Sequence, residues 1–253
     1  MKAHALGIAI IFVRELRLFF GDWTQVVGSL LQPMLFLVVF GHGLAPSLSS
    51  NLNISYLSFL FPGMVGLTVL TTATSAGVSL LWDRQFSYLR IILVSPVPRS
   101  AIALGKVLGG VTIACIQGAI VLMAAPLLGI SFPLLELPAM ILMMLLGAAA
   151  MNLLGLAIVT RIRSLNGFQL VMGLVSMPML LLSGAFFPLN QSPAWMRTLA
   201  FFDPYTYAID GMRAAIGHSF VLLSFWADVG ILAMLTVLLL FLTVRALSKP
   251  DNP

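Results

Sequence analysis

Charged side chains are scarce in this sequence of 253 residues: Asp, Glu, Lys and Arg together make up 8%. Soluble domains carry about 25% charged and about 45 to 50% apolar residues. This chain is 60% hydrophobic, with a mean hydropathy of +1.07. A water-soluble globular domain is therefore excluded. The net charge of +5 is spread too thinly to form a nucleic-acid-binding surface, so nucleic acid is not an expected partner.

Cysteine and histidine are also rare. Cysteine occurs once, at Cys115, and the three histidines, His4, His42 and His218, are scattered along the chain. A single cysteine excludes an internal disulfide, and no Cys or His spacing resembles a metal-binding set. We expect neither a metal nor a cofactor to be bound by this chain.

Catalytic and nucleotide-binding motifs are missing as well. Neither G-x-S-x-G nor G-x-S-G occurs, so a serine nucleophile with its base has no support. The only Gly-Lys pair, Gly105-Lys106, lacks the remaining residues of a P-loop. No Asp, Glu, Lys or His stands near the middle of an apolar run, where an ion-coupled carrier usually needs one. The sequence predicts that this chain is not an enzyme and that any pumping is powered by a separate subunit.

Long apolar runs are what the sequence has in abundance. A helix needs about 20 residues to cross a hydrocarbon core of about 30 Å. Six runs are long enough, and no internal repeat or low-complexity linker divides them. We predict an all-α membrane protein, one domain over residues 1–253, with spans at 26–44, 59–82, 104–128, 137–160, 168–187 and 227–244.

The cations are unevenly distributed over the connectors between these spans. With six spans, one side of the membrane receives all of the Lys and Arg residues except Arg197 and Arg213. Positive residues are enriched on the cytoplasmic side of membrane proteins. We therefore predict an integral protein of the cytoplasmic (inner) membrane with both termini in the cytoplasm.

Residues 1–22 form a separate N-terminal segment. An apolar stretch after Lys2 resembles a signal peptide, but Arg14, Glu15 and Arg17 interrupt it and no cleavage site follows. Arg14 and Arg17 are three residues apart and share a helix face, while aromatic side chains can enter the lipid boundary. We predict an uncleaved interfacial helix; a frayed, partly inserted tail is the alternative.

The connector at 83–103 concentrates charge between the second and third spans. Its first part has helix-compatible residues until 95–98, where two prolines end the helix. Leu89, Ile92 and Leu93 recur at helical spacing, so one face could fit a groove on another protein. The pattern predicts a short cytoplasmic helix, and an ordinary loop resting on lipid headgroups is the alternative.

A second long connector, residues 188–227, lies on the external side. It is rich in aromatic residues, which prefer the membrane interface, and prolines divide it into pieces. Two short helices are expected, at 194–202 and at 205 to about 216. Asp210 and Arg213 are spaced i, i+3 and can pair. Neither helix is long enough to cross, so we expect both to dip in from outside or lie along the surface.

Hydroxyl side chains form one stripe of the second span: Thr68, Thr72, Ser75 and Ser79, with Thr71 beside it. Such a stripe can line a shared cavity without burying charge, or it can let helices pack closely, and both interpretations stay open. Gly105 and Gly109 form a small-xxx-small pair for which close packing is expected. The other deep polar groups are neutral and usually hydrogen-bond between helices: Gln32, Gln117, Asn152 and Gln169.

Two stretches resemble signatures of ABC-2 type transporter permeases. The first, WDRQFSYLRIILVSPVPRSAIALGKVLG, has an acidic-basic pair ending the second span and an L-x-x-x-P-V-x-R turn leading into G-K. The second, LSGAFFPLNQSPAWMRTLAFFDPYTYAIDGMR, contains P-x-T-Y-x-x-D-x-x-R between the last two spans. With the N-terminal helix and six spans, the resemblance covers nearly the whole chain. Within this family, the chain resembles the permeases of daunorubicin-resistance and nodulation-factor exporters.

The resemblance implies three groups of functional residues. Those implied to couple to a separate ATPase are Asp83, Arg84, Gln85, Leu89, Arg90, Leu93, Pro96, Arg99 and Lys106. Those implied to line a cavity between the second and fifth spans of two copies are Thr68, Thr71, Thr72, Ser75, Ser79 and Gln169. Those implied to close the pathway externally are Phe186, Phe187, Pro188, Pro204, Tyr207, Asp210 and Arg213. Relatives often carry glutamate where this chain has Gln85 and Ile91, which weakens the expected charge pairing with the ATPase.

These expectations define a function. The chain is expected to be the permease subunit of an exporter that moves a hydrophobic or amphipathic compound such as a drug, a lipid or a lipid-linked glycan. Its expected partners are an ABC ATPase subunit that holds ATP and Mg, a second permease copy in a homodimer, and membrane lipids. A membrane scaffold or assembly factor without transport is the alternative.

Overall fold

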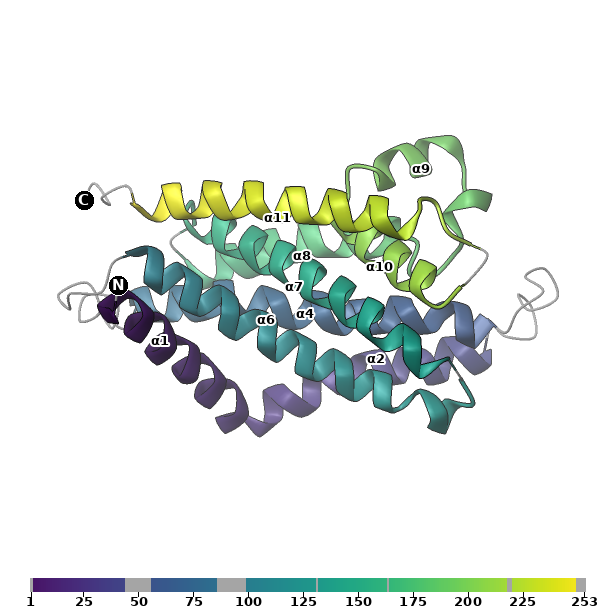
Figure 1. Ribbon diagram of the computed structural model, residues 1–253, viewed down its shortest axis with the longest axis horizontal. Coiled ribbons are helices and arrows are strands. Elements are labelled where there is room, and N and C mark those ends of the chain that lie inside the picture. The colour runs from purple at the N-terminus through teal and green to yellow at the C-terminus, as the bar shows by residue number, and fades with distance from the viewer. Residues whose placement is uncertain are drawn as a thin grey trace.

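The computed structural model describes residues 2–43, 56–85, 99–130, 132–162, 164–217 and 220–248. Within these ranges the chain is helical and has no strand, and six helices are long and apolar enough to cross a membrane, as predicted. They lie side by side in one elongated bundle (Figure 1). The six are α2 (Trp23–Gly43), α4 (Tyr56–Gln85), α6 (Arg99–Met123), α7 (Leu137–Val159), α8 (Leu165–Leu182) and α11 (Phe225–Ser248).

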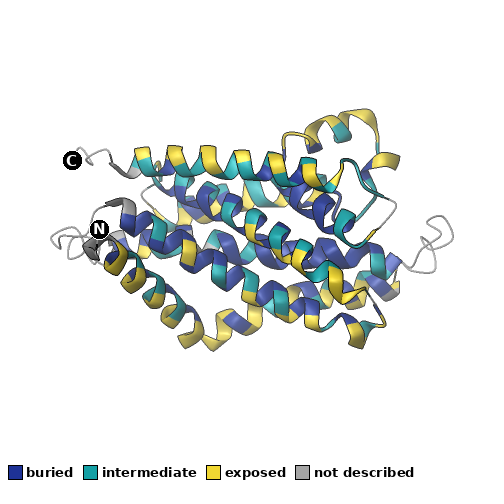
Figure 2. Cartoon of the chain, viewed as in Figure 1, coloured by how far each residue is buried: buried dark blue, intermediate teal, exposed yellow. Residues whose placement is uncertain are grey.

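Helix α4 occupies the centre of the bundle and packs against α2, α6, α7 and α8. The consecutive residues Phe59, Leu60 and Phe61 are all fully buried, although successive residues point in different directions around a helix. Helices α2, α8 and α11 instead turn many apolar side chains outward, as the yellow segments in Figure 2 show. An apolar outer surface over apolar buried helices is the pattern of a bundle surrounded by lipid.

The N-terminal segment is the helix α1 (Lys2–Gly21), as predicted, and it packs along α6. Gly105 and Gly109 make this close approach possible, because a Cβ at these positions would lie 2.7 Å from the Ile11 Cβ and 2.8 Å from the Glu15 Cβ. The expected packing role of this glycine pair is therefore confirmed. Asp22 separates α1 from α2, and its carboxylate accepts the Thr24 N–H at 3.1 Å at the start of α2. The interfacial position of α1 stays a prediction.

The third predicted span ends where the apolar segment ends, at Leu128, although its α-helix is shorter, and the fifth predicted span ends earlier than expected. Helix α6 ends at Met123, and a 3-10 turn, η1 (Ala125–Leu128), follows because Pro126 cannot continue the helical hydrogen bonds. A second turn, η2 (Leu134–Glu136), leads into α7. Helix α8 ends at Leu182, two residues before Gly184, whose φ of 76° is a left-handed conformation that glycine adopts readily.

The 188–227 connector contains η3 (Leu189–Gln191) and two helices, α9 (Ala194–Ala200) and α10 (Pro204–Ala215). Both predicted short helices are confirmed to within about two residues. Helix α10 packs against α4, α7 and α11, whereas α9 projects from the bundle (Figure 1). Their position relative to the membrane surface stays a prediction.

The start of α1 and the end of α11 lie at one end of the bundle, and α9 and α10 lie near the other (Figure 1). This is the arrangement expected for an even number of spans. The predicted helix of the 83–103 connector falls mainly on residues 86–98, which lie outside the described residues.

Candidate functional site

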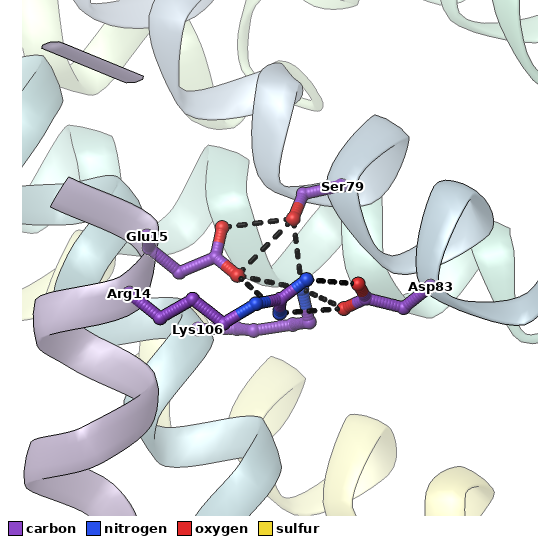
Figure 3. A network of polar contacts seen from close by, with 5 residues as sticks. All are labelled: Arg14, Glu15, Ser79, Asp83 and Lys106. Atoms are coloured by element: carbon purple, nitrogen blue, oxygen red, sulfur yellow. Dashed lines mark hydrogen bonds and ion pairs between the residues drawn. The ribbon is translucent and has the colours of Figure 1, made fainter. Parts of the chain in front are cut away.

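Four charged side chains and one hydroxyl meet where α1 crosses α4 and α6, in a group that we call the ionic cluster: Arg14, Glu15, Ser79, Asp83 and Lys106 (Figure 3). Helix α1 supplies Arg14 and Glu15, α4 supplies Ser79 and Asp83, and α6 supplies Lys106. Three helices therefore share one polar centre.

Lys106 is the centre of the ionic cluster and is 1% exposed. Its Nζ lies 2.8 Å from Glu15 Oε1 and 2.8 Å from Asp83 Oδ2, and it donates a hydrogen bond of 2.8 Å to Ser79 Oγ. An ammonium group has three donors and no acceptor, so these three contacts use its full capacity. Without them, a buried lysine would be strongly destabilising.

Arg14 completes the charge balance. Its guanidinium binds Asp83 through both terminal nitrogens, with Nη1 donating to Asp83 Oδ2 at 3.0 Å, and Nη1 also lies 3.5 Å from Glu15 Oε1. Two cations thus face two carboxylates, and the Ser79 hydroxyl donates to Glu15 Oε2 at 2.8 Å. Paired and hydrogen-bonded charges can be buried, whereas removing one partner typically costs about 3 to 5 kcal/mol.

Asp83 and Lys106 are the only residues of the predicted coupling set whose side chains are described. Both contact other helices of the same chain rather than standing free for a partner. The backbone of Arg84, Gln85 and Arg99 is helical, but the positions of these side chains are not described. The remaining members, Leu89, Arg90, Leu93 and Pro96, lie outside the described residues, so their predicted role stays a prediction.

Sequence reasoning did not foresee the role of Arg14 and Glu15, because it placed Arg14 with Arg17 on one face of an interfacial helix and paired neither residue with another helix. A signal was available: Arg14 and Glu15 are consecutive in α1, Asp83 begins the connector between the second and third spans, and Lys106 stands at the start of the third span. In a chain with so few charges, two opposite pairs predicted on the same side of the membrane are candidates for pairing.

The hydroxyl stripe of α4, where its side chains are described, faces the interior of the helix bundle. The Thr68 hydroxyl donates to the Met64 carbonyl at 3.0 Å, Thr72 hydrogen-bonds Gln117 Oε1, and Ser79 belongs to the ionic cluster. Gln117 in turn donates to Ser29 Oγ on α2. Thr72 and Ser79 therefore bind neighbouring helices, whereas Thr68 binds the backbone of its own helix, and the side chain of Ser75 is not described.

Two other predicted cavity residues come together in a different place. Thr71 and Gln169 both line an open groove of about 340 Å³ between α4 and α8, together with the hydroxyl residues Thr74 and Ser176. Phe168 and Met172 provide apolar walls. The groove therefore offers hydroxyl and amide groups on an apolar surface, and it lies on the pair of helices that the sequence predicted to face the pathway.

Around the first residues of the external connector, aromatic side chains join α2, α4 and the end of α8. The Phe186 ring packs edge-on against Phe36 at 6.0 Å and Phe40 at 5.8 Å between centroids, and its carbonyl accepts the Tyr56 hydroxyl at 3.0 Å. Phe187 and Pro188 follow in the same turn and are half-buried. Phe186 thus contacts both α2 and α4 within one copy of the chain.

Asp210 and Arg213 do not form the predicted ion pair. Both are buried, and each binds backbone groups: Asp210 Oδ2 accepts the N–H groups of Leu222 and Leu223 at 2.9 Å, and Arg213 Nη2 donates to the Gly184 carbonyl at 2.6 Å. The turns before α11 and after α8 leave backbone groups unpaired, and these nearby polar side chains satisfy them. The Arg213 guanidinium also lies 4.0 Å from the centre of the Phe59 ring.

Burial shifts the acidity of both groups. Desolvation lowers the pKa of Arg213 to about 10, although the nearby Asp210 charge opposes this shift. Desolvation also raises the pKa of the Asp210 carboxyl, against the effect of its two backbone donors and of Arg213. Helix α10 therefore joins the ends of α8 and α11 through buried polar contacts.

The start of α10 is fixed by two further members of the signature. Pro204 occupies the first helical turn, where its missing N–H has no consequence, and Asp203 caps the helix by accepting the Tyr205 N–H at 2.8 Å. Burial raises the pKa of Asp203 to about 7, although its hydrogen bonds with Tyr205 and Thr206 oppose the shift. The Tyr207 hydroxyl donates to the Phe201 carbonyl at 2.6 Å and connects α10 to α9.

A bundle of six apolar helices, with an ionic cluster at one end and a buried aromatic and polar connector at the other, defines a multi-span membrane protein. The family described as ABC-2 type transporter matches residues 7–217, which is most of the chain. The chain belongs to the ABC-2 type transporter family. ABC-2 permeases generally work with an ATP-binding subunit.

Curated relatives agree with this assignment. The chain is 30% identical to the transport permease ycf38 of Porphyra purpurea over 243 residues, covering 90% of this chain and 82% of the relative. It is 26% identical to the inner membrane transport permease YadH of Escherichia coli K12 over 215 residues, 84% of each chain. It is 30% identical to Nodulation protein J of Rhizobium leguminosarum bv. trifolii over 229 residues, 89% of this chain and 86% of the relative.

Proposed function

We propose that this chain is the permease subunit of an exporter in the cytoplasmic membrane. Two copies form the pathway, and a separate ATP-binding subunit supplies the energy. The substrate is hydrophobic or amphipathic, and both termini and the 83–103 connector face the cytoplasm. Family membership and the inner-membrane location named for the relative YadH support this proposal.

The observation that carries the proposal is the connection between α1 and the end of α4. Asp83 lies two residues before the end of α4, and the chain continues from there into the charged connector. Arg14 and Lys106 bind both oxygens of Asp83 from α1 and α6. A partner that moves the connector therefore displaces α4 together with α1 and α6, because breaking the cluster would leave buried charges unpaired.

Helix α4 extends this movement to the groove. Thr71 and Gln169 line the groove between α4 and α8, and α4 passes from the ionic cluster to the aromatic contacts of Tyr56 and Phe186. In a pair of copies with α4 and α8 facing each other, two such grooves form one passage with hydroxyl, amide and apolar walls. We infer that Phe186, Phe187, Pro188, Pro204, Tyr207, Asp210 and Arg213 close this passage on the external side.

The proposal is tested on the chain purified from native membranes together with the proteins that bind it. An ATP-hydrolysing subunit should be recovered, and the complex in proteoliposomes should move a fluorescent amphipathic dye when ATP is supplied. The double substitution Arg90→Ala and Pro96→Ala should leave ATP hydrolysis in place while dye transport falls at least tenfold. Arg161→Ala, in another connector on the same side, is the matched control and should transport normally.

Two results would contradict the proposal. Recovery of the chain without any ATP-hydrolysing protein, under conditions that preserve membrane complexes, would favour a scaffold. Full dye transport by the Arg90→Ala and Pro96→Ala protein would show that the 83–103 connector is not where the energy enters.

A further inference from the structure

A pocket of about 630 Å³ lies between the end of α6 and the start of α7, at the end of the bundle that holds α10 (Figure 1). Residues of the turns η1 and η2 and of the chain between them form its remaining wall. All ten lining residues have an apolar side chain or, at Gly129, none. Its volume is in the range of about 300 to 1,000 Å³ that is usual for ligand pockets, but it lacks the few polar groups that most ligand pockets contain.

The pocket exists because α6 ends before its apolar segment does. Pro126 has no N–H to donate, so the chain leaves the α-helix after Met123 and continues as η1. Gly129 then has a φ of 72°, a left-handed conformation that suits glycine, and it redirects the chain after η1. Two short turns therefore connect α6 to α7 where a further helical turn would have filled the space, and an apolar hollow is left between them.

The inner wall of the pocket belongs to the core of the bundle. Leu122 and Ile130 are only 5% and 7% exposed, and the ring centroid of Phe132 lies 6.3 Å from that of Phe61, which is fully buried on α4. The rim is open by contrast, because Met123 and Leu134 are 78% and 80% exposed. The pocket is thus a preformed hollow with a fixed apolar floor and an apolar mouth.

The mouth of the pocket is continuous with the lipid-facing surface of two spans. Ile116, Ile120 and Met123 are spaced i, i+4 and i+7 on α6, so they form one exposed stripe that ends at the pocket. On α7, Ile141 lines the pocket and Leu145 follows one turn later, and both are exposed. An apolar path therefore leads from the pocket along α6 and α7 into the surrounding bilayer.

The apolar lining restricts what can occupy the pocket. Water is disfavoured, because a buried water molecule needs about two to four polar partners and the lining side chains offer none. A polar ligand group would lose its hydration without gaining a hydrogen bond to a side chain. An empty pocket is also unfavourable, because its walls would lose dispersion contacts. Hydrocarbon meets all three conditions, and the bilayer supplies it at the mouth of the pocket.

We propose that this pocket holds one acyl chain of a phospholipid from the surrounding bilayer. One segment of the chain lies against Leu122, Ile130 and Phe132, and the rest follows the exposed stripes of α6 and α7. Dispersion contacts with a fixed wall hold the lipid, because bilayer chains are as apolar as the pocket and the hydrophobic effect does not favour either place. The site does not depend on the proposed export function, since it shares no residue with the groove between α4 and α8.

The first test counts the lipid that stays bound. The full-length chain is purified in dodecyl maltoside and washed free of bulk lipid, and the phospholipid retained per chain is measured by native mass spectrometry. Ala119→Phe places a ring in the pocket, so it should lower the retained phospholipid by about one molecule per chain. Ala233→Phe adds the same ring at a half-buried position of α11 and should retain as much as the parent. An unchanged helix content shows that both variants fold.

A second measurement locates the acyl chain in the unmodified protein, so it does not depend on how Ala119→Phe folds. The protein is placed in nanodiscs of a phosphatidylcholine that carries a photoreactive diazirine on one acyl chain, and the labelled residues are identified by mass spectrometry. Leu122 and Ile130 should be labelled at least as strongly as Val237 and Phe241, which are exposed on α11. Leu122 and Ile130 are buried, so a bilayer lipid reaches them only through the pocket. In Ala119→Phe their labelling should fall about threefold or more.

Three results would overturn the proposal. The first is equal retention of phospholipid by the parent and by Ala119→Phe, or retention of a free fatty acid in place of a phospholipid. The second is absence of label from Leu122 and Ile130 in the unmodified protein. The third is a disulfide between two copies that carry Met123→Cys together with Cys115→Ala, which would show that a second copy of the chain covers the pocket.

Discussion

The two ends of the bundle bury charge in different ways. At one end, the ionic cluster pairs side chain with side chain, so that Lys106 and Arg14 are balanced by Glu15 and Asp83. At the other end, Asp210 and Arg213 bind backbone groups of the turns around α8 and α11. Side-chain pairs join separate helices and depend on charge balance, whereas backbone contacts fix the ends of helices. The first arrangement suits a joint that transmits movement, and the second suits a fixed closure.

The largest expected effect is at the ionic cluster. Lys106→Met leaves two buried carboxylates, Glu15 and Asp83, with Arg14 as their single cation, so one carboxylate is unpaired and the free energy of unfolding should fall by about 3 to 5 kcal/mol. Equilibrium unfolding in mixed micelles of dodecyl maltoside and SDS, followed by helix content, measures this loss.

Charge balance predicts that a second substitution restores part of the stability that Lys106→Met loses. Adding Glu15→Gln to Lys106→Met removes the unpaired carboxylate, so the double variant should be more stable than Lys106→Met alone by about 1 to 3 kcal/mol. A double variant as unstable as the sum of the two single changes would show that the cluster is held by shape rather than by charge.

The same pair of substitutions, first of the cation and then of the acid, should restore no stability at the other end of the bundle. Arg213→Met removes a charge-assisted hydrogen bond to Gly184 and should cost about 2 to 3 kcal/mol. Adding Asp210→Asn should not rescue this loss, because Asp210 is held by Leu222 and Leu223 and would lose contacts of its own. If the second change did restore stability, Asp210 and Arg213 would be acting as an ion pair after all.

Several features of the fold follow from local sequence patterns. The six spans, the two external helices and the close contact at Gly105 and Gly109 depend on the length and composition of single segments, and the structure confirms them. The ionic cluster could not be predicted in this way. Arg14 and Asp83 are separated by 69 positions, and a periodic pattern gives the face of a helix without naming the helix that it meets.

The stripe on α4 and the pair on α10 illustrate this limit. Spacing correctly placed Thr68 and Thr72 on one face, but that face meets α6 and the backbone of its own helix. Asp210 and Arg213 are correctly spaced for an ion pair, yet each lies nearer to unpaired backbone groups at the ends of other helices. In both cases the competing partner comes from a distant part of the sequence.

The pH dependence of the unfolding free energy should distinguish the two ends of the bundle further. Asp203, at the end of the bundle that holds α10, has its pKa raised by burial from 3.8 to about 7, so the folded state favours its protonated form. The contribution of the Asp203 carboxyl to the stability of the folded protein is fully present below about pH 4. It is lost as the pH rises through about 7. One unit of pKa shift corresponds to about 1.4 kcal/mol, so the shift of Asp203 could change the free energy of unfolding by at most about 4 kcal/mol. We expect about 2 kcal/mol, because water at the end of the bundle screens the charge.

This effect is measured as the difference in unfolding free energy between the parent and Asp203→Asn at pH 4.5 and pH 8. Asparagine keeps the cap on Tyr205 but does not titrate, so the substituted protein should lose less stability than the parent over this interval. Identical pH profiles would show that the Asp203 carboxyl is ionised in the folded protein.

The smallest expected effect concerns the link between α9 and α10. Tyr207→Phe removes the hydroxyl that donates to the Phe201 carbonyl at 2.6 Å and changes little else, so the expected loss is about 1 kcal/mol. Because this contact belongs to the fixed end, the loss should not depend on charges at the ionic cluster. The Tyr207→Phe change should therefore cost the same in the parent and in the Lys106→Met background, within about 0.5 kcal/mol. A larger difference between the two backgrounds would mean that the two ends are coupled through α4, and that the external closure responds to the joint at the other end.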